Sequence, residues 1–376
     1  MDPSAHRTDS QTYRIDRRQA LRGALAAGLV ASLPLVRARA QSVTLPNVPP
    51  VPDRLKGSGT VRVANAGGAL AMAERKAVYE PFQKLTGIAI EETEGYAIPK
   101  IKAQVDTGNI EWDVVTLGYG NTLVLIQEGD YLEPIDYGLI DAPGLPARFR
   151  RKFSVGALTL ATVMTYRTDA FDKTPSSWAD YWDLKRFPGP RTYMSGTQGI
   201  GVDLWPALLA DGVPMDKLYP LDIQRAFAAL DRIKDSIVTY WSTGAQSAQL
   251  MADNETVLGT AWNGRIGSLL ESRQPVGISW KGARFGTDDH IILKGSPNLA
   301  NAQKFVAFCC LPEVQARLSL LIEYGGTNAD AQQFIPAERT KLLPSAHLAE
   351  GFFADELWER DHQKAITEAW SKWVLA

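Results

Sequence analysis

Two glycine-bearing turns contain the first residues of this sequence whose types and spacing could bind a ligand. Gly67 and Gly68 lie in the turn Asn65 to Ala69, and a second glycine pair lies in the turn Gly118 to Asn121. Glycine lets a backbone expose N–H groups, which could donate hydrogen bonds to a bound molecule. Neither turn completes a phosphate or dinucleotide fingerprint, because Leu123 stands at the third glycine position of the second turn. The alternative is that both are tight turns at strand ends.

Catalysis would require a nucleophile or an acid–base pair in a recognisable setting. His290 follows Asp289 directly, but a lone histidine beside an acid is also common where it has only a structural role. The sequence has no G-x-S-x-G or H-E-x-x-H motif and no histidine-based triad in a convincing context. We therefore expect His290 to be structural, Asp289 to face solvent, and the chain not to be an enzyme. An exported hydrolase or transferase is the competing class.

Metal and cofactor chemistry also finds few suitable residues. The only two cysteines, Cys309 and Cys310, are adjacent inside the apolar run Ala302 to Leu311, so we expect them to be buried and reduced. No C-x-x-C pair is present, and one of the four histidines lies in the first 40 residues. A ferric site would need paired tyrosines, whereas the tyrosines here are scattered. These observations predict no metal and no cofactor.

Length and composition set the scale of the molecule. A chain of 376 residues with 45% hydrophobic content can bury two ordinary cores. Charged residues make up 22%, and the net charge is -2 without a basic or acidic tail, which argues against nucleic acid as a partner. We find none of the internal repeats that would suggest a scaffold or adhesion module.

The first 40 residues have the pattern of an export signal. A basic region, a short apolar stretch and a small-residue cleavage site follow one another: Arg14, Arg17, Arg18 and Arg22; Gly23 to Val36; and Ala38-Arg39-Ala40. The segment Asp16 to Arg22 resembles the twin-arginine signal, the general export route being the alternative. We expect a signal peptide that is cleaved after Ala40 and a mature protein in the periplasm. Cleavage removes seven Arg and three Asp, so 33 basic and 39 acidic residues remain.

Strands alternate with helices after the proline-rich linker at residues 41–58. The hydrophobic pattern predicts strands at 60–64, 88–92 and 112–117, and helices at 71–86 and 99–106 that stop at Gly87 and Gly108. Such alternation predicts an α/β fold with a parallel sheet, in which ligands bind at the carboxyl ends of the strands. Both glycine-bearing turns would then lie on the same rim of the sheet.

Short motifs in a fixed order carry a family resemblance. They are Val61-Arg-Val-Ala-Asn-Ala-Gly-Gly, Tyr79-Glu-Pro-Phe-Gln-Lys-Leu-Thr-Gly-Ile, Trp112-Asp-Val-Val, Ser177-Trp-Ala-Asp-Tyr-Trp, Trp262-Asn-Gly-Arg, Lys294-Gly-Ser-Pro-Asn and Tyr324-Gly-Gly-Thr-Asn. Over roughly residues 59 to 376, the chain resembles the spermidine/putrescine-type periplasmic binding proteins, which serve ABC importers.

The resemblance implies a two-lobed periplasmic-binding-protein fold, type II-like, with two mixed sheets flanked by helices and a hinge between the lobes. Lobe 1 would comprise residues 59–160 and 286–335, and lobe 2 residues 161–285 and 336–376. A small-molecule solute would bind in the cleft, and the lobes would close on it by hinge motion. The implied partners are this solute and an inner-membrane ABC permease, and we expect a monomer.

The resemblance also places candidate ligand residues in the cleft. Asp288 matches a carboxylate that faces the ligand amine, and Trp262 matches an aromatic residue that packs on the ligand chain. The alternatives are a loop-capping acid and a core tryptophan. Weaker candidates lie in or beside glycine-bearing turns: Tyr119, Tyr324, Tyr96, Ser195, Trp241, Gly67 and Gly68.

Two departures from the polyamine pattern affect the predicted solute. Gly286 stands where that family supplies an aromatic residue near the acid, and the loop 194–201 lacks the pair of carboxylates that spermidine binders often have, with Asp203 as the nearest acid. We predict a small polar, amine-containing, polyamine-like solute. A monoamine, an amino acid, an amino-sugar derivative and an opine-like compound stay open as alternatives.

Overall fold

The structure is a computed structural model that describes residues 43–195 and 203–376. The predicted signal peptide, with its twin-arginine segment and cleavage site, lies outside these described residues, as does most of the loop after Ser195. Among the helices of the described ranges, none combines the length and the apolar character needed to cross a bilayer.

The first strands and helices alternate as the hydrophobic pattern predicts. Strand β1 (Thr60–Asn65) pairs in parallel with β2 (Ala89–Glu94) and with β3 (Val114–Gly118). Helices α1 (Gly68–Glu74) and α2 (Glu80–Thr86) are joined by a π-helical turn, Arg75–Tyr79, and α3 spans Ile98–Thr107. Helices α2 and α3 end at Gly87 and Gly108, whose φ angles of 80° and 68° reverse the chain.

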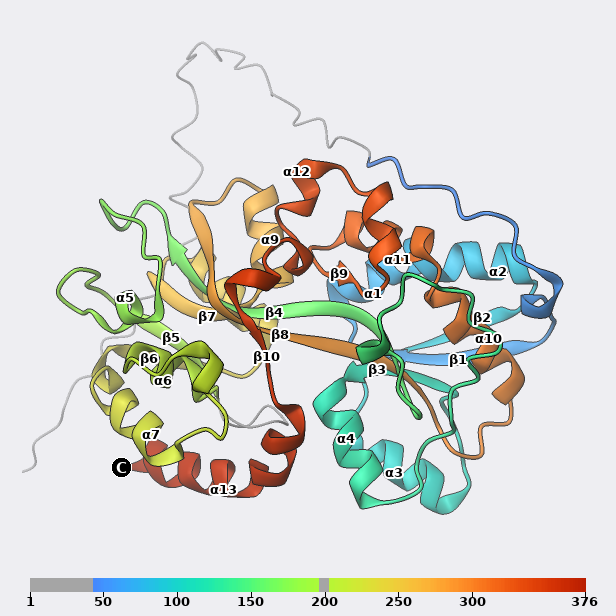
Figure 1. Ribbon diagram of the computed structural model, residues 1–376, viewed down its shortest axis with the longest axis horizontal. Helices are drawn as coiled ribbons and strands as arrows, with labels where there is room; N and C mark the ends of the chain where they lie inside the picture. Colours follow the sequence, from blue (N-terminus) through green and yellow to red (C-terminus); the bar gives the residue numbers. More distant parts are fainter. Residues whose placement is uncertain (1–42, 196–202) are drawn as a thin grey trace, which may run out of the picture. The chain divides into compact units, whose positions relative to one another are not determined.

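Two long antiparallel strands run through the middle of the sheet. Strand β4 (Val155–Arg167) pairs with β8 (Val276–Ile292) along most of its length, and Figure 1 shows both passing from the elements around β1 to those around β5. Their pairing shifts register between Gly156 and Leu158 and again between Thr162 and Met164. Between these two shifts, residues 158–162 face residues 284–288 in regular register.

The pairing of β4 with β8 joins the described strands into one sheet. The ten strands of residues 43–195 and 203–376 follow the order β2-β1-β3-β8-β4-β7-β5-β6, with β10 beside β8 and β9 beside β4. The α/β class is therefore confirmed, and the two predicted mixed sheets are continuous because the crossing strands hydrogen-bond to each other. The remaining strands are β5 (Arg191–Met194), β6 (Ile237–Trp241), β7 (Leu258–Trp262), β9 (Gly325–Gly326) and β10 (Phe352–Phe353).

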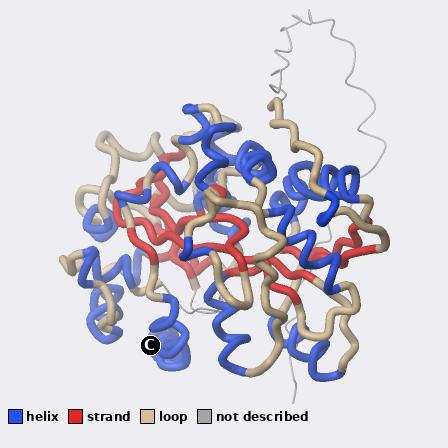
Figure 2. Tube along the Cα trace, turned by 45° about the vertical axis from the view of Figure 1, so that its right-hand side comes forward, coloured by secondary structure: helices blue, strands red, loops and turns tan. Residues whose placement is uncertain are grey.

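Helices cover both faces of this sheet, as Figure 2 shows. The helices after α3 are α4 (Tyr119–Glu128), α5 (Trp178–Trp182), α6 (Trp205–Ala210), α7 (Ile223–Asp231), α8 (Gly244–Ala252), α9 (Asn263–Glu271), α10 (Leu299–Cys309), α11 (Pro312–Leu321), α12 (Ala337–Thr340) and α13 (Glu356–Leu375). Helix α13 packs against both α7 and α4, so the C-terminal segment contacts elements at both ends of the crossing strands.

Two large apolar cores lie toward opposite ends of the crossing strands. One contains Phe82, whose ring meets those of Phe305 and Phe308 edge-on at centroid distances of 5.2 and 5.3 Å. The other is rich in tryptophan and includes Trp178, Trp205 and Trp370. Both cysteines are buried in the first core, as predicted. The predicted lobe boundaries stay predictions.

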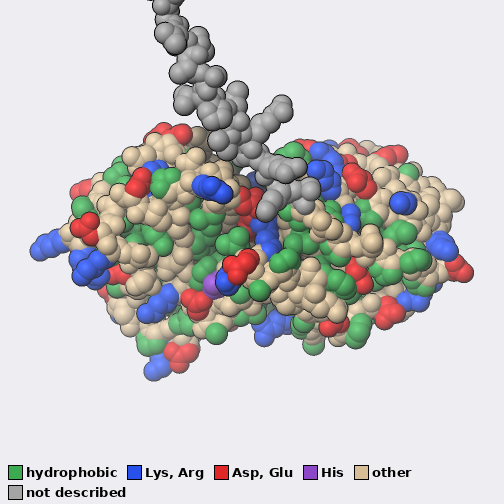
Figure 3. Space-filling model, turned by 90° about the horizontal axis from the view of Figure 1, so that it is seen from above, with side chains coloured by type: hydrophobic (Ala, Val, Ile, Leu, Met, Phe, Trp, Pro, Cys, Tyr) green, Lys and Arg blue, Asp and Glu red, His purple; other side chains and the backbone are tan. Residues whose placement is uncertain are grey.

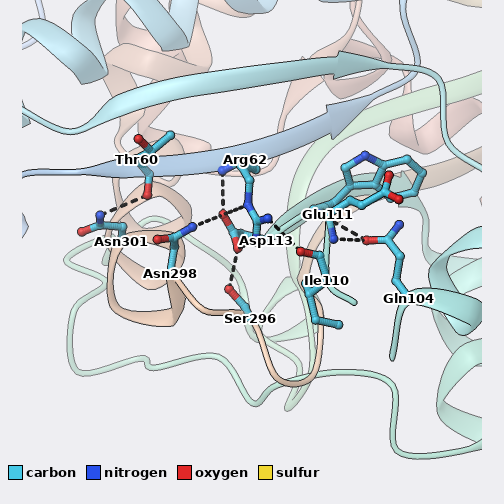
Figure 4. A network of polar contacts seen from close by, with 10 residues as sticks. Thr60, Arg62, Gln104, Ile110, Glu111, Asp113, Ser296, Asn298 and Asn301 are labelled. Atoms are coloured by element: carbon cyan, nitrogen blue, oxygen red, sulfur yellow. Dashed lines mark hydrogen bonds and ion pairs between the residues drawn. The ribbon is translucent and has the colours of Figure 1, made fainter. Parts of the chain in front are cut away.

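A buried carboxylate, Asp113, ties the first three-strand unit together (Figure 4). It accepts hydrogen bonds from Arg62 on β1 and from Ser296 and Asn298 in the loop before α10, at 2.7 to 3.1 Å. Burial alone would raise its pKa, but these bonds and the Arg62 charge hold the pKa of Asp113 below its usual value. Two of the family motifs, at Trp112 and Lys294, thus supply a structural hub.

Replacing the hub carboxylate tests its structural role. Asp113→Ala should lower the free energy of unfolding by about 3–5 kcal/mol, because Arg62 and two loop donors lose their common acceptor. Glu111→Gln is the matched control, since the Glu111 side chain forms an exposed ion pair with Lys100, and it should cost less than about 0.5 kcal/mol. Urea unfolding of the mature chain measures both, and equal losses would contradict the assignment.

Candidate functional site

A cleft of about 600 Å³ lies over the regular stretch of the crossing strands. Leu160 and Thr162 of β4 and Arg284, Gly286 and Asp288 of β8 form part of its lining. The turns after β1 and β3, the start of α9 and the start of α13 supply further lining residues: Ala66, Gly118, Tyr119, Asn121, Arg265 and Glu356. The two predicted glycine-bearing turns do share one rim, because β1 and β3 run parallel.

Asp288 is a half-buried carboxylate at this cleft without a partner of its own. No side chain of residues 43–195 or 203–376 forms a hydrogen bond or ion pair with it, although Asn121 and the turn at Gly118 lie close by. Burial, reinforced by the adjacent Asp289, raises the pKa of Asp288 to about 7. An unpaired acid in such a place is suited to receive a cationic group from a ligand.

Arg265 brings a positive charge to the same cleft. It forms no ion pair within the described ranges, and its Nε atom is buried without a hydrogen-bond partner there. Its guanidinium lies beside Tyr324. Burial raises the pKa of that tyrosine to about 12, and the charge of Arg265 opposes this rise. Arg265, Asp288 and Tyr324 all line the cleft, and the charge of Asp288 adds to the rise in the pKa of Tyr324.

Close packing around Gly264 fixes where Arg265 and Tyr324 lie. A Cβ atom on Gly264 would be only 2.3 Å from the Tyr324 ring, so this position requires glycine. The neighbouring Asn263 accepts a hydrogen bond from Ala161 N and donates one to Glu323 O, which holds α9 between β4 and the chain before β9. The motif Trp262-Asn-Gly-Arg therefore positions the cleft residues.

Aromatic side chains complete this part of the cleft. Trp262, Tyr96 and Tyr119 all line it, as does Tyr324. Burial raises the pKa of Tyr96, with the Asp288 charge adding to the effect, so its hydroxyl stays protonated. The Tyr119 ring lies 3.5 Å from the Arg151 guanidinium, measured to the ring centroid. Trp262 meets Trp241 edge-on at 5.5 Å.

The remaining predicted ligand residues lie outside the lining. Trp241 is fully buried and donates from Nε1 to Thr260 at 3.0 Å, and Ser195 is buried at the end of β5, where its N–H bonds to Trp241 O. The Gly67 N–H is already bonded to the Asn65 side chain. Gly68 is exposed and faces Arg265, whose Nη1 would be 4.0 Å from a Cβ there.

Asp289 and His290 differ in their surroundings from Asp288. The expectation that Asp289 faces solvent is wrong: it is fully buried and accepts bonds of 2.6 Å from both Arg151 and Ser154. The alternation of β8 sends neighbouring side chains to opposite faces, which explains the difference. His290 bonds to Thr116 at 2.8 Å, and burial lowers its pKa to about 4.

A second polar group lines the cleft near the start of α13. Arg284 pairs with Glu359 at 2.6 Å, while Asp203 accepts one bond from Trp205 Nε1 at 3.2 Å. Burial raises the pKa of Asp203 to about 6 and that of Glu356 to about 7. Arg265 stood inside a quoted motif and could have been predicted, whereas Arg284 and Glu356 carry no local sequence signal.

The described residues hold no group of three or more His, Cys, Asp and Glu side chains placed to bind a metal ion. Acidic and basic side chains are interspersed over the face drawn in Figure 3. What the geometry offers is a cleft with charges of both signs and an aromatic lining, which is suited to hold a small polar molecule.

Comparison with known proteins identifies the class. Residues 77–345 match the family described as bacterial extracellular solute-binding protein. The chain belongs to this solute-binding family. Proteins of this kind bind small molecules and deliver them to the membrane permease of an ABC importer.

Relatives of this solute-binding protein span nearly the whole described chain. A γ-aminobutyric acid-binding protein of Pseudomonas aeruginosa is 33% identical over 329 residues, which cover 84% of this chain and 91% of that protein. An ABC transporter substrate-binding protein of Bradyrhizobium japonicum is 35% identical with a TM-score of 0.79, covering 84% and 99%. The protein AgtB of A. tumefaciens R10, solved with agropinic acid, is 31% identical with a TM-score of 0.74, covering 85% and 99%. The two-lobed fold is confirmed.

Because Asp288 has no partner among the described residues, we predict that the stability of the ligand-free solute-binding protein falls as pH rises. Its folded pKa lies above the unfolded value of 3.8, so ionisation destabilises the fold progressively as pH rises toward 7. Asp288→Asn should therefore raise the melting temperature by roughly 2 °C at pH 8 and change it little at pH 4. Asp289→Asn is the neighbouring control and should lower it, because Arg151 loses its partner. A difference for Asp288→Asn that does not vary with pH would contradict this account.

Proposed function

We propose that this protein captures a zwitterionic amino acid of the γ-aminobutyrate class and delivers it to an inner-membrane ABC permease from the periplasm. The observation that carries the proposal is a pair of opposite charges in one cleft, Asp288 and Arg265, neither of which forms an ion pair with residues 43–195 or 203–376. The ammonium of the ligand would pair with Asp288 and its carboxylate with Arg265. Each charge would then be satisfied by the ligand.

The charge pattern favours an amino acid over the predicted polyamine. A diamine would bring a second ammonium toward Arg265, and like charges in a partly buried cleft cost free energy. An amino acid with separated ends satisfies both charges. The similarity to a γ-aminobutyric acid-binding protein supports the same choice.

Closure of the cleft would couple binding to delivery. The lining residues come from elements on both sides of β4 and β8, so a bound ligand stabilises the arrangement in which both sides approach. Trp262 and the tyrosines would shield the aliphatic chain of the ligand from water. The predicted monomer is sufficient for this cycle.

Isothermal titration calorimetry with a series of related ligands tests the proposal. γ-Aminobutyrate should bind more tightly than putrescine, which lacks the carboxylate, and than butyrate, which lacks the amine. β-Alanine and 5-aminovalerate report the spacing that the two anchors prefer. Tighter binding of putrescine than of γ-aminobutyrate would contradict the assigned role of Arg265.

Variants of the two anchors give a second test. Asp288→Asn and Arg265→Gln should each weaken γ-aminobutyrate binding by about 2–5 kcal/mol, because one charge of the ligand is left unpaired. Arg232→Gln is the matched control: Arg232 pairs with Asp211 on the surface, and its loss should leave the affinity unchanged. If both anchor variants bind as tightly as the wild type, the site lies elsewhere.

Trp262 should contribute through contact with the ligand chain. Trp262→Ala should weaken binding by about 0.5–2 kcal/mol and reduce the change in tryptophan fluorescence on ligand addition. The circular dichroism spectrum serves as the control for folding. A folded variant with unchanged affinity would assign Trp262 to packing against Trp241 alone.

A further inference from the structure

The cleft has room for more than a four-carbon amino acid. Its volume of about 600 Å³ lies within the range of pockets that hold drug-sized ligands, whereas γ-aminobutyrate has only seven non-hydrogen atoms. The charges assigned to that ligand occupy the part around Tyr324. The part near the start of α13 is lined by different residues, which the proposed function does not use.

Two buried side chains in that second part each keep an atom without a partner. Asp203 and Arg284 are 8% and 6% exposed, and both line the cleft. The Oδ2 atom of Asp203 and the Nε atom of Arg284 form no hydrogen bond within the described ranges. A buried acceptor and a buried donor left open in this way each cost free energy until something satisfies them.

Strand β8 connects the two parts of the cleft. Arg284, Gly286 and Asp288 lie at alternate positions of the strand, and all three line the cleft. The Cα atoms of Arg284 and Asp288 are thus about 13 Å apart along an extended strand. Gly286 lies between them without a side chain, opposite Leu160 on β4.

Gly286 keeps the path between the two parts open. A Cβ atom there would be 3.7 Å from Arg284 Nη1 and 3.9 Å from Glu356 Oε1, so an alanine fits by ordinary contact. A larger side chain at this position would enter the space between Asp288 and Arg284. The absence of a side chain therefore lengthens the cleft along β8.

We propose that Asp203 and Arg284 form a second subsite that binds an uncharged hydrogen-bonding group, a hydroxyl or a carboxamide, on an arm extending from the amino group of the ligand. Such a group donates to Asp203 Oδ2 and accepts from Arg284 Nε, so it satisfies both open atoms. An ammonium offers only donors and a carboxylate only acceptors, and each would leave one atom unmet. The preferred solute is then an amino acid whose nitrogen carries a polar chain.

This subsite rests on the proposed function, because its ligand is anchored at Asp288 and Arg265. Four derivatives of γ-aminobutyrate, each with a six-carbon chain on the nitrogen, separate the possibilities by calorimetry. The chains are a polyhydroxylated 1-deoxyglucityl group, a 5-carbamoylpentyl group, a 6-aminohexyl group and a plain hexyl group. All keep a protonatable secondary amine and the same carboxylate.

The glucityl or the carbamoyl derivative should bind at least tenfold more tightly than the hexyl derivative, and the better of these two identifies the group. Asp203→Asn keeps the shape of the side chain and an acceptor for Trp205, so it should remove this gain while changing γ-aminobutyrate affinity less than threefold. Gly286→Leu should weaken all four derivatives at least tenfold, whereas Gly286→Ala, the matched control, should not.

Several outcomes would overturn the subsite. Tightest binding of the aminohexyl derivative would make it an ammonium site, and tightest binding of the hexyl derivative would make it apolar. Equal losses for γ-aminobutyrate and the glucityl derivative in Asp203→Asn would indicate a structural role. If γ-aminobutyrate binds through Asp288 and Arg265 but no derivative does, the subsite alone fails; if γ-aminobutyrate does not bind, the proposed function fails with it.

Discussion

The antiparallel pairing of β4 with β8 is the interaction on which the rest of the molecule depends. Because these two strands hydrogen-bond to each other, ten described strands form one sheet although the apolar cores lie on either side. The same pairing makes the floor of the cleft, since residues 158–162 and 284–288 supply lining from both strands. The fold and the candidate binding site therefore share one set of backbone hydrogen bonds.

The electrostatics of the cleft follow from which charges are paired. Asp113 and Asp289 are buried with arginine partners and hydroxyl donors, and they hold elements together. Asp288 lies next to Asp289 in the chain, but among the described residues it has no such partner, and Arg265 forms no ion pair with an acid there. A protein that leaves opposite charges open in a concave site has spent folding free energy that a complementary ligand can restore.

Sequence predicted the early α/β alternation well because each helix stop was a glycine in the left-handed region, as at Gly87 and Gly108. Five of the candidates also line one cleft: Asp288 and Trp262, which the family resemblance indicated, and Tyr96, Tyr119 and Tyr324, which lie in or beside glycine-bearing turns. Sequence could not place Glu356, which reaches the cleft only because the C-terminal chain returns beside α4. Asp289 was misjudged because its burial depends on Arg151, 138 residues away.

The two register shifts in β4 have a mechanical consequence. They lie on either side of residues 158–162, so the floor of the cleft is a regularly paired, stiff segment with an irregular position at each end. Irregularities of this kind concentrate bending and twist. Rotation of one side of the molecule against the other would then leave the spacing of Arg284, Gly286 and Asp288 unchanged. This constant spacing would select solutes by their length.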